Sequence, residues 1–136
     1  MRLLAALALA AVAASAEDVT VVRVVPGSHL DIGFTDTPDA VRAKRIKVLD
    51  DAIDTAQADP EFRWFEESGW VLDAWREAHK DDAKRLEALR ALLRTGQVSM
   101  GAAWCNPHAA MFADHLDLLF FQRDEFEKVF GVRPLT

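Results

Sequence analysis

The chain lacks several features that would assign it to a common class of protein. Its only cysteine among 136 residues is Cys105, so no disulfide can form within it and a hydrophobic core must hold it together. Basic residues are not in excess: 16 Lys and Arg stand against 22 Asp and Glu, and the net charge of −6 provides no electrostatic footprint for nucleic acid. There is no internal repeat, no low-complexity linker and, after the first residues, no apolar run long enough to cross a bilayer.

What the first residues do have predicts export. Arg2 precedes an apolar run over residues 3–14, and an Ala-x-Ala cleavage motif stands at residues 14–16. This pattern is typical of a signal peptide over residues 1–16, which leaves residues 17–136 as a single secreted or periplasmic domain. The alternative is an N-terminal membrane anchor, but the apolar run is shorter than the roughly 20 residues that a spanning helix needs.

Strands and helices are predicted to alternate along the rest of the chain. The valine-rich residues 20–25 are typical of a parallel strand covered on both faces, and residues 61–68 and 97–104 predict two further short strands. A helix is expected after Asp36 or Thr37, with Pro38 in its first turn. Another is expected to start near Asp81 or Asp82 and to stop at Gly96, and the last to be capped by Asp114 or a neighbour and closed by Gly131. Apolar stripes predict the inward faces of the helices: Ile46, Leu49, Ile53 and Ala56; Trp70, Val71, Leu72 and Trp75; Leu86, Leu89 and Leu93; Leu116, Leu119, Phe126 and Phe130. This alternation predicts an α/β fold with a parallel sheet.

Polar side chains gather where each predicted strand ends. His29 and Asp31 follow the first strand, Glu66 and Glu67 end the second, and His108 follows the third. In parallel α/β folds, function sits at the carboxyl ends of the strands. These residues can therefore face one cleft although they are far apart in sequence.

The spacing of His29 and Asp31 allows two interpretations. In an extended segment, residues i and i+2 point to the same side, so an imidazole and a carboxylate together can hold a divalent metal such as zinc. Ordinary turn chemistry explains the pair as well, with His29 capping a turn and Asp31 accepting backbone N–H groups. Two ligands do not complete a zinc site, which needs three or four.

The other polar and aromatic candidates also have structural explanations. Only one of Glu66 and Glu67 can face the cleft, where it could bind hydroxyls or transfer protons, and either can equally be a helix N-terminal acid. Trp104 is expected in the core or the cleft wall, and His108 in the cleft or on a surface loop. The remaining candidates are interpreted as structural: Cys105 as a small buried residue, and His79 and His115 as surface or capping residues.

Taken together, these stretches resemble the N-terminal domain of glycoside hydrolase family 38, the α-mannosidases and their relatives. The family's opening His-x-Asp-x-Gly-aromatic motif is matched by HLDIGF at residues 29–34. Its F-x-W-x-E strand is matched by FRWFEES at residues 62–68, and its third strand by GQVSMGAAW at residues 96–104. The G-x-x-P that follows a later helix is matched at residues 131–134.

The resemblance implies a seven-stranded parallel (β/α) barrel of which residues 17–136 form the first part. It also implies one zinc or other divalent ion bound by His29 and Asp31, by a later Asp that is also the nucleophile, and by a much later His. The implied activity is retaining hydrolysis of a carbohydrate, an α-mannoside, with the metal gripping two sugar hydroxyls. Phe34 would stack on the sugar. The other residues expected to contact substrate are Glu66, Glu67, Trp104 and His108.

Two departures from the family pattern shape these expectations. The family's third strand commonly ends in W-x-x-P-D-E, whereas here His108 takes the place of the aspartate, which leaves the exact sugar open. The nucleophile is expected on a strand after Thr136, so we predict no catalytic residue within the chain and expect the chain alone to be an inactive fragment or remnant.

Two other functions compete with the glycosidase. One is a metal-dependent polysaccharide deacetylase, but the sequence lacks that class's paired Asp-Asp near the first strand and its His-x-x-x-His. The other is a secreted remnant or carbohydrate-binding fragment without catalysis or metal.

Overall fold

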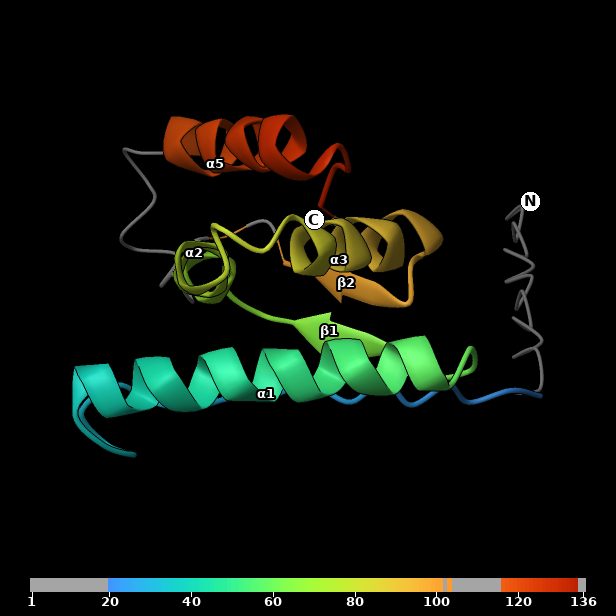
Figure 1. Ribbon diagram of the computed structural model, residues 1–136, viewed down its shortest axis with the longest axis horizontal. Coiled ribbons are helices and arrows are strands. Elements are labelled where there is room, and N and C mark those ends of the chain that lie inside the picture. The colour runs from blue at the N-terminus through green and yellow to red at the C-terminus, as the bar shows by residue number, and fades with distance from the viewer. Residues whose placement is uncertain (1–19, 102, 104–115, 135–136) are drawn as a thin grey trace, which may run out of the picture.

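The chain forms an α/β unit whose helices and whose second and third predicted strands follow the predicted order. The structure is a computed structural model, and it describes residues 20–101, 103 and 116–134. Its elements are α1 (Pro38–Ala58), β1 (Trp64–Glu66), α2 (Gly69–Ala78), α3 (Ala83–Thr95), β2 (Val98–Met100) and α5 (Leu116–Phe130), as Figure 1 shows. The predicted signal peptide lies outside the described residues.

The sheet is parallel, as predicted, and its strands lie side by side in chain order. β1 pairs with β2 in a register that sets Trp64 opposite Val98. A single parallel bridge joins Gly27 to Phe65 on the other side of β1, with the Phe65 amide donating to the Pro26 carbonyl at 3.0 Å. Three extended segments therefore run in one direction with helices between them, which is the arrangement of an α/β fold. The described residues show this two-stranded sheet and its extra bridge; they do not show a barrel.

The prediction of a buried strand over residues 20–25 is wrong for the described structure. This segment is a coil that joins no strand ladder (Figure 1), and Val21, Val22 and Val24 are 68%, 79% and 85% exposed. A strand that is apolar on both faces needs cover on both faces. No described element provides that cover, and the chain meets β1 just after this segment, at Pro26 and Gly27.

The predicted helix starts and stops are confirmed where the structure describes them. Pro38 is the first residue of α1 after Thr37, and Asp82 caps α3 by accepting from the Arg85 amide at 2.9 Å. Gly96 ends α3 at a φ of +74°, a left-handed conformation that glycine adopts without strain. The predicted cap of the last helix at Asp114 and the side chains of Leu116 and Leu119 lie outside what the structure describes.

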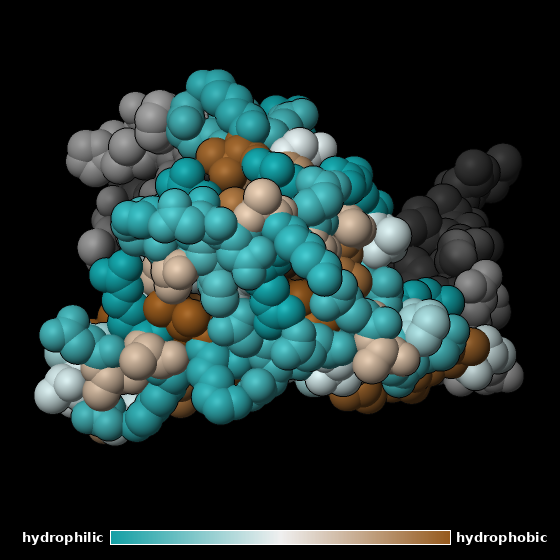
Figure 2. Space-filling view, viewed as in Figure 1, coloured by the Kyte–Doolittle hydropathy of each residue, from teal (hydrophilic) through white to brown (hydrophobic). Residues whose placement is uncertain are grey.

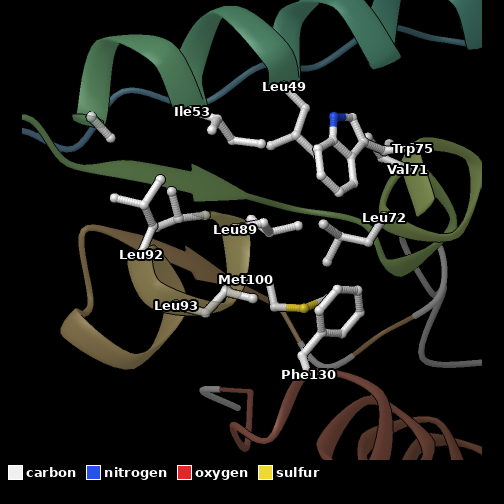
Figure 3. Packing of buried hydrophobic residues seen from close by; sticks show 12 residues of the cluster. Leu49, Ile53, Val71, Leu72, Trp75, Leu89, Leu92, Leu93, Met100 and Phe130 are labelled. Atoms are coloured by element: carbon white, nitrogen blue, oxygen red, sulfur yellow. The ribbon is translucent and has the colours of Figure 1, made fainter. Parts of the chain in front are cut away.

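The hydrophobic core lies between the helices and one face of the sheet (Figure 3). It contains side chains from α1, α2, α3, β2 and α5: Leu49, Ile53, Ala56, Val71, Leu72, Trp75, Leu89, Leu92, Leu93, Val98, Met100 and Phe130. Trp75 is its largest fully buried member. Along the strands, burial alternates: Val98 and Met100 face this core, whereas Phe65 is 40% exposed on the other face of the sheet.

The outer surface of the helices is polar. Figure 2 shows hydrophilic side chains over most of the face that the helices form. Among the described helices, none combines the length and the apolar character that a transmembrane span requires.

Candidate functional site

His29 and Asp31 lie in the loop that follows the Gly27 bridge. The Nε2 atom of His29 is 2.9 Å from Oδ1 of Asp31, and both side chains are more than half exposed. The loop then turns back: the Thr35 amide donates to the Asp31 carbonyl at 3.0 Å, and Gly33 adopts a φ of +89°. The two side chains therefore lie together with an open side toward solvent, as the i, i+2 spacing predicted.

Glu67 meets His29 from the end of β1. Its Oε1 and Oε2 atoms lie 2.7 and 2.9 Å from the Nδ1 atom of His29, and its side chain is mostly buried. The parallel bridge between Gly27 and Phe65 brings these two chain segments together. Hydrogen bonding to Glu67 first, and then to Asp31, raises the pKa of His29 above its ordinary value.

Glu66 points the other way, into the protein. Its carboxylate is fully buried and forms an ion pair with Arg45 of α1, whose guanidinium also donates to the Ser28 carbonyl. Sequence reasoning missed Arg45. The signal was present, because Arg45 stands four residues from both Val41 and Leu49 on the buried stripe of α1, where a charge requires a buried partner.

The environment of Glu66 favours its neutral form. Burial raises its pKa to about 7, against the opposing effect of the Arg45 charge. Its Oε2 atom is buried without a hydrogen-bond partner, which fits this direction, and the opposing effects of Ser68 and Trp64 are smaller than that of burial. The prediction that Glu66 contacts substrate stays a prediction; the described contacts of its side chain are within the protein.

The two donors of the loop fit a divalent cation chemically. Imidazole nitrogen and carboxylate oxygen are the ligands of mixed zinc sites, and His29 and Asp31 present one of each at close range on an exposed side. Within the described part of the chain, no group of three His, Cys, Asp or Glu side chains could hold a metal. A cation held here would therefore take its further ligands from elsewhere.

The remaining predicted substrate contacts are placed as follows. Phe34 is 95% exposed in the loop next to Asp31, so its ring face is open. Trp104 and His108 lie outside the described residues, and so does Cys105.

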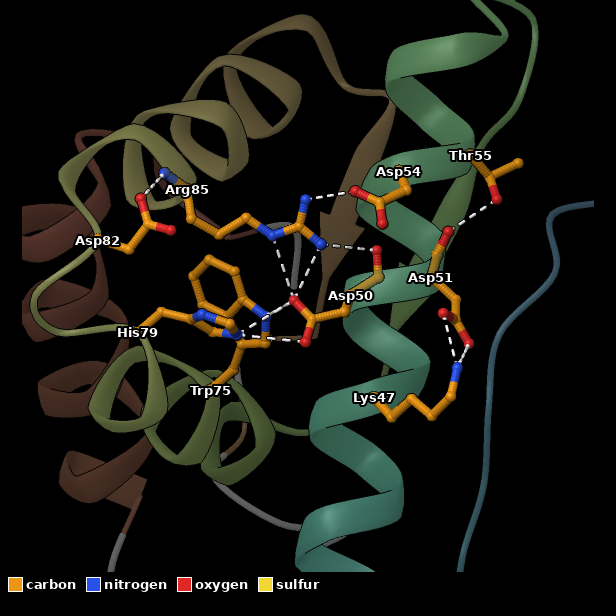
Figure 4. Close-up of polar contacts among 9 residues, drawn as sticks. All are labelled: Lys47, Asp50, Asp51, Asp54, Thr55, Trp75, His79, Asp82 and Arg85. Carbon is orange, nitrogen blue, oxygen red and sulfur yellow. Dashed lines mark hydrogen bonds and ion pairs between the residues drawn. The ribbon is translucent and has the colours of Figure 1, made fainter.

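A second histidine–aspartate pair, which the sequence did not predict, lies within the helical layer. Asp50 of α1 accepts from Trp75 Nε1 at 2.9 Å and from Arg85 Nη2 at 2.9 Å, and His79 Nε2 lies 3.1 Å from its Oδ1 (Figure 4). Arg85 also bonds Asp54. His79 is the C-cap residue of α2, in agreement with the capping role expected for it. This network ties α1, α2 and α3 together.

One comparison with known proteins finds a match, and that match agrees with the motifs. A search of curated proteins finds no match to the chain. The family model described as "Glycosyl hydrolases family 38 N-terminal domain" matches residues 19–134, a range that includes His29, Asp31, Arg45 and Glu67. That family consists of glycoside hydrolases, which act on carbohydrates, and membership therefore favours a glycosidase over a polysaccharide deacetylase. The chain thus belongs to glycosyl hydrolase family 38, and the match to the family's N-terminal domain covers residues 19–134.

Proposed function

We propose that this domain contributes to the metal-dependent, retaining hydrolysis of α-mannosides by an exported glycosidase. The observation that carries the proposal is the exposed pair of His29 Nε2 and Asp31 Oδ1, 2.9 Å apart, inside the family match. Zinc is the divalent ion that best suits one imidazole and one carboxylate. The signal-peptide pattern of residues 1–16 supports export.

Each residue of the loop has a distinct task in this proposal. His29 and Asp31 each donate one atom to the cation, and the exposure of both side chains leaves room on its outer side for sugar hydroxyls. When bound, the metal supplies Lewis acidity and orients those hydroxyls. Phe34, with its open ring, supplies an apolar platform for the sugar face.

Zinc titration of the chain by calorimetry tests the metal part of this proposal. We expect one zinc per chain, bound weakly because His29 and Asp31 are only two of the three or four ligands that a zinc site needs. We expect a loss of at least roughly 100-fold in affinity for His29→Ala and for Asp31→Ala, because each removes one of these two ligands. His79→Ala is the matched control, since it removes a histidine that also touches an aspartate, and it should leave zinc binding unchanged. Equal zinc affinity in the wild type and the three variants would contradict the metal site and favour the interpretation of His29 and Asp31 as turn residues.

Sugar binding tests the substrate part. Methyl α-mannoside should perturb the zinc-loaded chain in a nuclear magnetic resonance titration, and the effect should vanish after chelation of the metal or after Phe34→Ala. Methyl α-glucoside, which differs at the 2-hydroxyl, is the matched ligand control. Equal responses to both sugars would contradict the mannoside assignment and leave the metal assignment standing.

A further inference from the structure

An imidazole ring can bind a cation only through the nitrogen that carries no proton. Which nitrogen that is depends on the hydrogen bond that the other nitrogen makes. In His29 both nitrogens face carboxylates: Nδ1 faces Glu67 and Nε2 faces Asp31. His29 Nε2 and Asp31 can bind a cation together only if the proton of the neutral ring stays on Nδ1.

The two carboxylates are unequal acceptors. Glu67 offers both oxygens to Nδ1, at 2.7 and 2.9 Å, and its side chain is only 24% exposed. Asp31 offers one oxygen at 2.9 Å, and its side chain is 57% exposed, so water competes for it. A hydrogen bond that is shielded from water and shared by two acceptor atoms holds the proton better. The geometry therefore favours the Nδ1–H form.

The buried ion pair between Glu66 and Arg45 fixes the position of Glu67. Its neighbour Glu66 is bound to Arg45, and the same guanidinium donates to the carbonyl of Ser28, the residue before His29. Arg45 Nη2 also lies 3.8 Å from Glu67 Oε1. One buried side chain of α1 thus sets the positions of both chain segments whose side chains meet at His29.

We infer that Glu67 is a positioning residue: it holds the Nδ1 proton of His29 and so turns the Nε2 lone pair toward Asp31 and the cation. This inference rests on the proposed metal site, and it gives Glu67 a task other than the sugar contact that its place after β1 suggested. Loss of such a positioning partner lowers metal affinity by roughly 10 to 100-fold.

A measurement of the His29 tautomer tests this inference directly and needs no metal. A long-range proton–nitrogen correlation spectrum of the histidine-labelled chain, at a pH where the ring is neutral, reports which nitrogen is protonated; His29→Gln identifies the signals. We expect Nδ1–H in the wild type. We expect the same form in Glu67→Gln, whose amide oxygen still accepts, and a shift to the Nε2–H form in Glu67→Leu. Glu61→Leu, the same change at an exposed glutamate that precedes β1, should match the wild type.

Two results would overturn the inference, and they do not depend on the zinc result. A wild-type spectrum dominated by Nε2–H would do so without any variant, even if Glu67→Leu fails to fold. An Nδ1–H form that persists in folded Glu67→Leu would do so as well. In the zinc titration, Glu67→Leu should bind at least roughly tenfold more weakly, whereas Glu67→Gln stays near the wild type. If the wild type shows Nδ1–H but binds no zinc, the proposed metal site fails while the role of Glu67 in fixing the tautomer stands.

Discussion

Two histidine–aspartate pairs in this molecule have almost the same separation and opposite surroundings. His29 and Asp31 approach to 2.9 Å in a loop, and His79 and Asp50 approach to 3.1 Å between helices. In the loop, both side chains are more than half exposed, whereas in the helical layer both are mostly buried. Residue type therefore does not distinguish a candidate ligand pair from a structural one; the difference lies in which atoms remain free to bind something else.

Two acids of these regions differ in the same way: Asp50, a member of the helical pair, and Glu66, which lies next to the loop pair. Burial by itself raises the pKa of both Asp50 and Glu66. For Asp50, hydrogen bonds from Trp75 and Arg85 outweigh burial and lower the pKa, so the ionised form is stable. For Glu66, Arg45 does not outweigh burial and Oε2 has no partner, so the pKa rises to about 7. In the helical layer the ionised form of Asp50 is therefore stabilised, whereas next to the His29 loop the ionised form of Glu66 is not.

The pH dependence of stability is where we expect the largest difference. Glu66 titrates near 4.5 in the unfolded chain and near 7 in the folded one, so the folded state holds the proton over that range. Its contribution to stability is complete below about pH 4.5 and is lost as the pH rises through about 7, by about 3 kcal/mol in total.

Urea denaturation of the wild type and of Glu66→Gln at a series of pH values checks this. Glutamine keeps the shape without the titration, so the wild type should lose stability relative to the variant as the pH rises. If the wild type instead gains stability over this range, the Glu66–Arg45 ion pair dominates over burial.

A smaller effect is expected from Asp50→Ala. This change leaves the buried Trp75 Nε1 without an acceptor and removes one of the partners of Arg85, and it should lower the free energy of unfolding by about 2 kcal/mol. Asp51→Ala is the matched control on the same helix: Asp51 is exposed and pairs with Lys47 one turn away, so its loss should lower stability by less than about 0.5 kcal/mol. Equal losses in the two variants would contradict the structural role of the Asp50 network.

Much of this architecture is predictable from the sequence, and the exceptions have physical reasons. Helix boundaries at Pro38 and Gly96 are local, because they depend on residues within one turn, and the His29–Asp31 pair is local for the same reason. The contact between Asp50 and His79 spans 29 residues, and no periodicity encodes it. The prediction for residues 20–25 is wrong for a different reason: their composition indicates a covered strand, but composition cannot say whether a covering element is present.

The central claim is that His29 and Asp31 bind metal, and that His79 and Asp50 do not. Extended X-ray absorption fine structure at the zinc edge tests this claim most directly. We expect the zinc-loaded chain to show imidazole scattering with a Zn–N distance of about 2.0 Å and oxygen ligands at about 2.0 to 2.2 Å. The imidazole signal should be lost in His29→Ala and retained in His79→Ala. An imidazole signal that survives in His29→Ala would contradict the account, because the histidine that binds the metal would then lie elsewhere in the chain.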